Sequence, residues 1–485
     1  MPGVEAPEIV LGPVLPELIL VGTAMAILLL DAVWPSSAQR LPVFLSLVAI
    51  AGAAAAALGL WNWDGAPTVL GGMVAADRFA VFFRLVVLAV AAVAVLLSAH
   101  YLERTGEGRG EYYVLVLFAT AGMTLLAASA DLIMVFLSLE VLSLSLYVLT
   151  GFSMRRLASQ EAGMKYFLLG AFSSAFFLYG VALAYGAGGT TSLSGLAGAL
   201  AGPTDELALA LAGAALLTVG FAFKVSAVPF HMWTPDVYQG APTPITAFMS
   251  AGTKVAGFGA LLRVASSALG PVQWDLTPVL WGLAALTMVV GSVVAIAQRD
   301  VKRMLAYSSI AHAGFVLVGV VAANQQGISG AMFYLAAYAA MIVGAFGVVM
   351  LVSQRGEERT SLAEYAGLAR RSPLLAGLLA LFLLSLAGIP PTAGFIAKVL
   401  VFRAAVDAGH WSLVVVAVIA TVIAAFFYIR LIVLSYMQEP RERAAIPTAP
   451  LPAAAVVATA VVTLVLGVLP FLLTGFLDSA AILRF

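Results

Sequence analysis

Long apolar stretches follow one another along almost the whole chain and are separated by short polar segments. About twenty apolar residues are needed for an α-helix to cross the hydrocarbon core of a bilayer. The pattern predicts fourteen such helices and therefore an all-α, polytopic membrane fold. Their approximate limits are 14–33, 41–61, 78–100, 113–130, 131–152, 162–186, 206–229, 241–265, 277–297, 302–322, 328–353, 373–407, 411–437 and 450–475.

Composition supports this prediction and excludes several other classes of protein. Of the 485 residues, 62% are hydrophobic and 10% are charged, whereas soluble domains carry about 25% charged residues. A net charge of zero gives no footprint for nucleic acid. The absence of cysteine excludes disulfides and iron–sulfur clusters held by this chain. The N-terminal stretch MPGVEAPEIVLGPVLPELIL has no basic region before its apolar run, so it is not predicted to be a cleaved signal peptide.

Basic residues are distributed unequally between the two predicted sides of the membrane. Loops after odd-numbered helices hold Arg40, Arg104, Arg109, Arg155, Arg156, Lys165, Arg299, Lys302, Arg303, Arg355, Arg359, Arg370, Arg371, Arg441 and Arg443. The other side holds Arg78, Arg84, Arg263, Arg403 and Arg484. Cytoplasmic loops are enriched in Lys and Arg. The chain is therefore predicted to be a multi-pass protein of the inner (plasma) membrane, with both termini outside.

Charge is costly within predicted spans, and four residues there stand out. Glu140 is the only carboxylate near the centre of a span, and Lys224, Lys254 and Lys398 are three of the five lysines in the chain. Intramembrane ionisable groups usually line ion or proton paths, and a desolvated lysine releases a proton near neutral pH, which arginine does not. A structural ion pair that joins helices is the alternative, but three lysines against one glutamate would leave excess positive charge. Proton transfer is the favoured hypothesis.

Two histidines are further relay candidates. His312 lies in the middle of the tenth span, and His231 follows the proline that interrupts the seventh. Histidine suits a relay because its unperturbed pKa is near 6.5, but a hydrogen-bonded packing role is an equal alternative for a single histidine in a span.

Two spans contain helix breakers. In the seventh, Lys224 is followed by VSAVPF, and in the twelfth, LAGIPPTAGF precedes Lys398. Interrupted hydrophobic segments in two halves of a chain indicate a transport site. Lys224 and Lys398 are 174 residues apart, and Glu140 and His312 are 172 apart. These spacings predict that spans 4–8 and 9–13 are repeats, the second inverted because five is odd.

The domain organisation follows from these repeats. The chain is predicted to be a single membrane domain, 1–485, made of an N-terminal group of three spans (1–112), a first repeat (113–265), an inverted second repeat (277–437) and a final span (438–485).

The stretch VPFHMWTPDVYQGAPTPITAFMSAGTKVAGF (228–258) resembles the signature of subunit N of the proton-pumping NADH:quinone oxidoreductase, respiratory complex I. That group lies within a wider family of antiporter-like subunits shared with Mrp-type cation/proton antiporters. The resemblance continues through QRDVKRMLAYSSIAHAGF (298–315) and GIPPTAGFIAK (388–398), and it covers essentially the whole chain.

The resemblance implies roles for individual residues and for partners. It implies that Glu140 pairs with Lys224, that Lys254 is the central lysine and that Lys398 is the exit residue; that the Glu140–Lys224 pair opens and closes is our hypothesis. It also implies flavin, iron–sulfur clusters and quinone in partner subunits, none of them held by this chain, and neighbours such as subunits M and K.

Three functions remain in competition. The first is a proton-translocating subunit that couples quinone reduction in its partners to proton transfer, and that is an enzyme only as part of that translocase. The second is a subunit of an Mrp-type cation/proton antiporter, and the third is a scaffold that pumps nothing. The motif PDVYQGAPTP favours the first.

Overall fold

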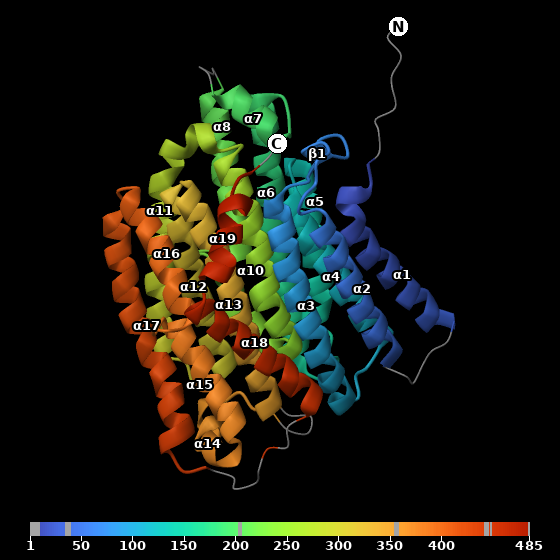
Figure 1. The fold of residues 1–485 in the computed structure, drawn as a ribbon, viewed down its shortest axis with the longest axis vertical. Coiled ribbons are helices and arrows are strands. Elements are labelled where there is room, and N and C mark those ends of the chain that lie inside the picture. The colour runs from blue at the N-terminus through green and yellow to red at the C-terminus, as the bar shows by residue number, and fades with distance from the viewer. Residues whose placement is uncertain are drawn as a thin grey trace.

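The computed structural model describes residues 10–33, 40–201, 206–353, 358–440, 446 and 449–483. These residues form a bundle of helices, most of which run along the long axis of the molecule (Figure 1). A two-stranded hairpin, β1 (Thr68–Val69) with β2 (Val74–Ala75), joins the second and third helices. The described segments also contain three short 3-10 turns, η1 (Gly12–Val14), η2 (Gly270–Val272) and η3 (Leu362–Tyr365).

Among the described residues, thirteen helices are long and apolar enough to cross a membrane. They are α1 (Leu15–Val33), α2 (Arg40–Gly59), α3 (Arg78–Thr105), α4 (Gly110–Ala128), α5 (Leu132–Thr150), α6 (Leu157–Gly188), α8 (Leu207–Val225), α10 (Thr243–Ser266), α11 (Gln273–Ile296), α12 (Val301–Ala322), α13 (Gln325–Val352), α17 (Trp411–Met437) and α18 (Pro450–Val468). The remaining helices are short: α7 (Leu193–Leu200), α9 (Trp233–Gly240), α14 (Leu368–Arg371), α15 (Pro373–Ala387), α16 (Ala393–Asp407) and α19 (Phe471–Ala480).

Both predicted helix breaks are confirmed. The seventh span stops at Val225 and resumes as α9, and the twelfth consists of α15 and α16 with Gly388 between them in the left-handed conformation, φ +84°. The pair α15 and α16, together with the thirteen longer helices, gives the fourteen expected crossings.

Matching contacts show that α4–α10 and α11–α17 are repeats. Asp131, just before α5, accepts a hydrogen bond from Thr191 Oγ1, and Asp300, just before α12, accepts one from Thr360 Oγ1. A short backbone bridge accompanies each contact, and both residues of the second are 169 positions beyond those of the first (131 and 300, 191 and 360). The first lies beside α7 at one end of the bundle and the second near α14 at the other (Figure 1), so the second repeat is inverted.

Two arginines, one in each repeat, also make matching contacts. Arg263 on α10 donates from Nε to the carbonyl of Ala127, 3.1 Å away, at the end of α4. Arg430 on α17 donates from Nη1 to Ile296, 2.9 Å away, the last residue of α11. In each repeat, an arginine therefore binds carbonyl groups at the C-terminus of a helix, which have no hydrogen-bond partner within that helix.

The repeat was predicted from two pairs of residues, and the offset of 169 residues shows that these pairs are not equivalent positions. It matches Glu140 with Ser309 and Ser143 with His312, so the spacing of 172 between Glu140 and His312 is one helical turn too long. Lys224 precedes the break in its span and Lys398 follows the other break, so these lysines are not equivalent either. The repeats are confirmed, but the two spacings were coincidences between residues that play different parts.

One end of the bundle carries the excess of basic residues expected from the sequence, and we call it the basic face. The basic face includes the segments around Arg104, Arg156, Arg299, Arg359 and Arg370. On the opposite side, Arg84 and Arg263 are buried inside the bundle rather than in loops. Arg355, Arg441, Arg443 and Arg484 lie outside the described residues.

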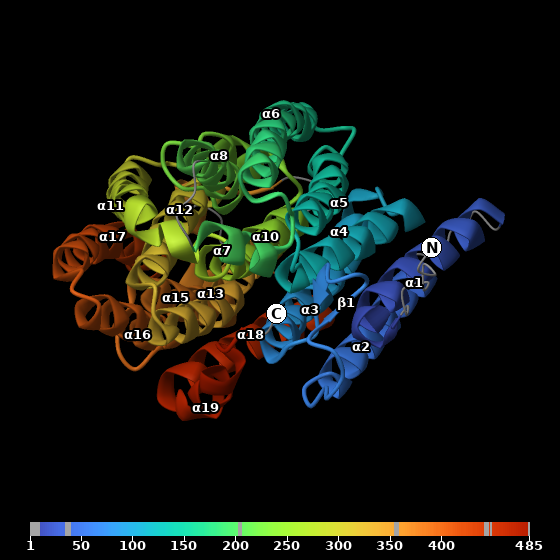
Figure 2. The same cartoon turned by 90° about the horizontal axis from the view of Figure 1, so that it is seen from above.

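Helix α10, which carries Lys254, runs through the centre of the molecule (Figure 2). Every residue from Thr243 to Val264 is buried. Near its C-terminal end, Arg263 forms a bidentate ion pair with Asp77 at the start of α3, with both N–O distances 2.8 Å. Both side chains are fully buried. This pair fixes one end of the helix.

Replacing Asp77 by alanine should destabilise the fold strongly, because it leaves the Arg263 guanidinium buried without its carboxylate. Breaking a buried pair in this way costs about 3–5 kcal/mol. The measurement is the temperature at which the detergent-solubilised protein loses its monodisperse peak. Glu439→Ala, which breaks an exposed pair with Arg370, is the control and should cost less than about 1 kcal/mol. Equal shifts for the two variants would contradict a role for the buried pair.

Candidate proton-transfer site

Lys224 is the second-last residue of α8, and its ammonium points between α5 and α6. Its Nζ donates to Ser143 Oγ at 2.9 Å and lies 3.5 Å from the Tyr166 hydroxyl. A cavity of about 10 Å³ adjoins these groups, which is close to the least space that one water needs. The buried ammonium is thus surrounded by hydroxyl groups.

Glu140 lies on the other side of the same group of helices but does not touch Lys224. Its carboxylate accepts a hydrogen bond from Ser174 on α6, and its side chain is half-buried. Among the described residues, no ion pair within 4.0 Å joins Glu140 to Lys224. The cavity beside Lys224 is lined by Ser143, one turn along α5 from Glu140, and by Ser174. The predicted pair is therefore present as two separated groups with serine hydroxyls between them.

Lys254 binds the end of the interrupted helix. From α10, its buried Nζ donates to the carbonyl of Val225 at 2.8 Å, and Val225 is the last residue of α8 and the neighbour of Lys224. A helix C-terminus carries about half a negative charge and unpaired carbonyls. The break therefore provides an acceptor for an ammonium in the middle of the membrane.

Lys398 has the same kind of partner in the second repeat. Its Nζ donates to the carbonyl of Ala387 at 3.0 Å and to that of Leu386 at 3.5 Å, at the end of α15. The ammonium also lies 4.6 Å from the centre of the Phe315 ring, within cation–π range. Although Lys254 and Lys398 come from different parts of their repeats, both end on the carbonyls of a half-helix.

His312, on α12, packs against Phe315, with the ring centres 5.9 Å apart, and the same Phe315 ring faces the Lys398 ammonium. Its Nδ1 is 2.7 Å from the Tyr334 hydroxyl and its Nε2 is 3.2 Å from that of Tyr428. The charges of Lys254 and Lys398 both act on its ring. The ring is buried and has a hydroxyl on each nitrogen, as a proton relay requires.

The structure does not bring His231 into this arrangement. It lies half-buried in the segment between α8 and α9, and its Nδ1 has no hydrogen-bond partner among the described residues. No hydrogen bond links it to Lys224, Lys254 or His312 within the described part of the chain.

Three tyrosines were missed by the sequence argument. Tyr166, Tyr334 and Tyr428 hold Lys224 or His312, and all are buried in helices. Their position in otherwise apolar spans was the available signal, since a buried tyrosine hydroxyl needs a partner.

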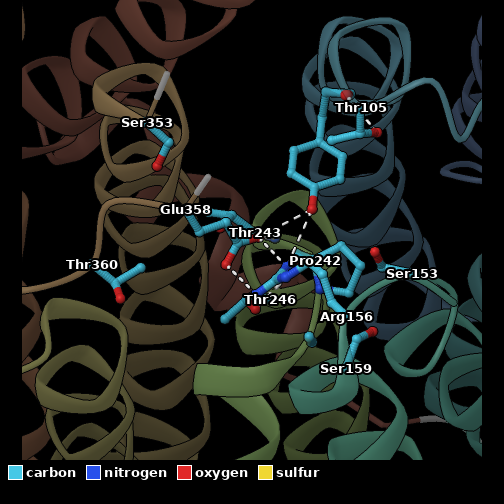
Figure 3. Close-up of polar contacts among 12 residues, drawn as sticks. Thr105, Ser153, Arg156, Ser159, Pro242, Thr243, Thr246, Ser353, Glu358 and Thr360 are labelled. Carbon is cyan, nitrogen blue, oxygen red and sulfur yellow. Dashed lines mark hydrogen bonds and ion pairs between the residues drawn. The ribbon is translucent and has the colours of Figure 1, made fainter. Parts of the chain in front are cut away.

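A second polar cluster, around Glu358, was also missed. Its carboxylate pairs with Arg156 Nη1 at 2.7 Å and with Lys302 Nζ at 2.8 Å, and it accepts from the backbone N–H of Thr243 at 3.1 Å and from the Tyr101 hydroxyl at 3.2 Å. Figure 3 shows Glu358, Arg156 and Thr243 converging from separate segments at the basic face. A glutamate in a loop gave no sequence signal.

Opposing influences act on the Glu358 carboxyl. Burial by itself would raise its pKa, but the charges of Lys302 and Arg156 outweigh burial and hold the pKa below the ordinary glutamate value. The carboxylate is thus ionised near neutral pH, and it ties the N-terminus of α10 to α12 and to the start of α6.

Comparison with known proteins places this arrangement in a family. A family model described as "NADH:quinone oxidoreductase/Mrp antiporter, TM" matches residues 129–424, more than half of the chain. The chain belongs to this family of antiporter-like membrane subunits. The matched region includes every proton-transfer candidate considered above, from Glu140 to Lys398.

Curated relatives confirm the resemblance to subunit N. The chain is 48% identical to NADH-quinone oxidoreductase subunit N of Rhodococcus opacus (strain B4), over 99% of this chain and 97% of the relative. It is 45% identical to the subunit N of Trichlorobacter lovleyi, over 97% and 96%. With the subunit N of Mycobacterium tuberculosis (strain ATCC 25618 / H37Rv), identity is 54% over 78% of this chain and 72% of the relative.

Solved structures share the fold. A chain of respiratory complex I from Thermus thermophilus with bound aureothin matches with a TM-score of 0.81 and 38% identity, over 95% of this chain and 99% of that one. A chain of the membrane-bound sulfane sulfur reductase, an archaeal respiratory complex, matches at 0.85 and 28%, over 97% and 96%. A chain of the Mrp complex from Dietzia sp. DQ12-45-1b, 23% identical over 97% of each chain, has the same fold with a TM-score of 0.84.

The low pKa of Glu358 predicts how stability depends on pH. A carboxyl whose folded-state pKa is depressed contributes stability above its unfolded pKa, about 4.3, and loses it as pH falls through the folded value. The native protein should therefore exceed Glu358→Gln in thermal stability by about 1–3 kcal/mol near neutral pH, and the difference should shrink below about pH 4. Unfolding temperatures in detergent across this range test it. A difference that does not change with pH would show that Glu358 carries no charge that matters for stability.

Proposed function

We propose that the chain moves protons across the membrane as a subunit of an NADH:quinone oxidoreductase of the complex I type, with quinone reduction in partner subunits driving the transfer. One observation carries this proposal: buried ionisable groups from both repeats, Lys224, Lys254, His312 and Lys398, are surrounded by hydroxyls and helix-end carbonyls, and the described structure gives none of them a carboxylate in direct contact. Such partners stabilise a charge without holding its proton permanently.

The route begins at the Glu140–Lys224 pair. Burial disfavours a charged ammonium, and a nearby carboxylate favours it. Movement of Glu140 towards Lys224 would load the lysine, and separation, as seen in this structure, would release its proton towards Lys254. The carbonyl that binds Lys254 belongs to the residue after Lys224, so the two ammonium groups are anchored at adjacent points of one half-helix.

The second repeat completes the route. Protons would pass from Lys254 to His312 and from there to Lys398, which releases them on the side opposite the basic face. Moving one charge against the membrane potential costs about 2.3 kcal/mol per 100 mV. A pair interaction worth about two pKa units, roughly 2.7 kcal/mol, is of that size. His231 is a relay candidate outside this route.

Orientation and partners follow from the same proposal. The basic face would lie in the cytoplasm of the inner membrane, with both termini outside. The two repeats would act as connected half-channels of a single membrane domain. Flavin, iron–sulfur clusters and quinone would be held by other subunits, and membrane subunits such as M and K would adjoin this chain. The apolar face of α5 and α6 beside Glu140, with Leu144 and Phe172 more than half exposed, is one surface for such a neighbour.

Glu140→Gln should reduce both quinone reduction and proton pumping, because the variant removes the charge but keeps the size of the side chain. A loss of about tenfold corresponds to 1.4 kcal/mol. The assay is NADH-dependent acidification of inverted membrane vesicles, with and without sodium. Glu161→Gln, at an exposed position on α6, is the matched control. Full pumping by Glu140→Gln would contradict the pair, and pumping that requires sodium would favour the antiporter alternative.

Affinity purification tests the assembly. A tagged chain extracted in mild detergent should co-purify with a large complex that shows flavin and iron–sulfur absorbance. Recovery of a small, cofactor-free set of antiporter subunits would move the assignment to the Mrp-type alternative.

A further inference from the structure

A pocket at the basic face leads to Glu358. Its volume is about 570 Å³, and its lining includes Arg299, Asp300, Arg303, Thr360 and Glu358. The Glu358 side chain is only 6% exposed, so the carboxylate forms part of the pocket wall while most of the group is enclosed by protein. Through Glu358, a solvent-filled space is in contact with buried charged groups.

Lys302 lies directly behind this carboxylate. Besides Glu358, its fully buried Nζ binds the carbonyl of Ala241 at 2.6 Å, just beyond the C-terminus of α9. Lys302 thus shares one feature with Lys254 and Lys398, an ammonium on the carbonyls at the end of a short or interrupted helix. It differs from them in also contacting a carboxylate, and the charge of that carboxylate is shared with Arg156. It is on α12, ten residues from His312, or about 15 Å along the helix.

Two buried hydroxyls lie in the region between Lys302 and His312. Thr243 Oγ1 forms no hydrogen bond with any described residue, while the backbone of Thr243 binds Glu358. The Tyr238 hydroxyl interacts with Ser309. Buried polar groups are normally satisfied by protein or by internal water, so the unpartnered Thr243 hydroxyl indicates internal water at this position.

The passage continues to the relay. Ser309 Oγ accepts a hydrogen bond from Tyr338 at 2.8 Å, and the Tyr338 ring lies 5.2 Å from that of His312, centre to centre. Polar side chains on α9, α10 and α12 therefore extend from the pocket to within one helical turn of His312, through Lys302, Thr243, Tyr238 and Ser309.

We propose that Lys302 and Glu358 form a proton-uptake site at the basic face, which supplies His312 through Tyr238, Ser309 and internal water. This inference rests on the proposed proton transport, and it adds an uptake point in the second repeat, separate from Glu140 and Lys224. In each cycle Lys302 gives one proton to the water beside Tyr238 and regains one from the pocket, so its charge is restored. Glu358 is a positioning residue that holds the lysine between the two spaces.

The decisive variants remove only hydroxyl groups. Tyr238→Phe combined with Thr243→Val deletes two hydroxyls and keeps the size of both side chains, so the fold and the assembled complex should be unaffected. Proton pumping and quinone reduction by that complex should fall at least tenfold, and the solvent deuterium isotope effect should rise because uptake becomes rate-limiting. Lys302→Arg, which keeps a cation beside Glu358 but does not release a proton, should lose pumping as well.

The controls separate this site from the rest of the proposal. Glu439→Gln, which alters an exposed ion pair of Arg370, should pump normally. Normal rates and isotope effect in the Tyr238/Thr243 double variant, alongside loss of pumping in Lys254→Ala, would overturn the uptake site alone. Normal pumping in Lys254→Ala would overturn the proposed function itself. If Lys302→Arg fails to assemble, the double variant still decides the question.

Discussion

The structure depends on one constraint: a charged ammonium group buried in the bundle needs acceptors that stabilise it, and for the proposed proton transfer these acceptors must not fix its proton. A carboxylate paired with that ammonium alone would hold the proton too firmly, and an apolar pocket would not tolerate the charge. Interrupted helices resolve this conflict, because the terminus of a half-helix carries only a partial negative charge. Lys254 and Lys398 both lie on such carbonyls. The helix breaks are therefore part of the electrostatics of the site rather than defects in the spans.

The inverted repeats provide the same framework twice and then diverge in chemistry. Asp131 and Asp300 fix corresponding turns at opposite ends of the bundle, and Arg263 and Arg430 bind the ends of corresponding helices. Within this framework, the position of Ser143 in the first repeat is taken by His312 in the second. One repeat therefore places a hydroxyl beside a lysine, while the other places an imidazole ring between two tyrosine hydroxyls. A symmetric scaffold thus carries different chemistry in its two halves, as a proton route with a direction would require.

Much of the fold was readable from the sequence because membrane helices and breaks depend on local composition. Apolar length predicted the crossings, and Pro229 and the Gly-Pro-rich stretch before Lys398 predicted both interruptions. The positions of three lysines within apolar spans likewise predicted that they are buried, and a charge inside the membrane is rare enough to mark a candidate site. The partners of these residues were not readable: Tyr166, Tyr334 and Glu358 are brought to the site by packing between distant helices. The similar spacings of 174 and 172 misled because they joined residues at non-equivalent positions of the two repeats, which only the matched contacts of Asp131 and Asp300 reveal.

The central helix shows why protons, rather than the helix, are expected to move. Arg263 and Asp77 form a fully buried pair at one end of α10, and Glu358 binds the backbone of Thr243 at the other. Lys254 lies between these two anchors on a helix that is buried from Thr243 to Val264. A displacement of α10 would have to break one of the anchors, at a cost of several kcal/mol. Reorientation of hydroxyls and transfer between neighbouring groups avoid that cost, so a rigid α10 with mobile protons is the arrangement that the packing favours.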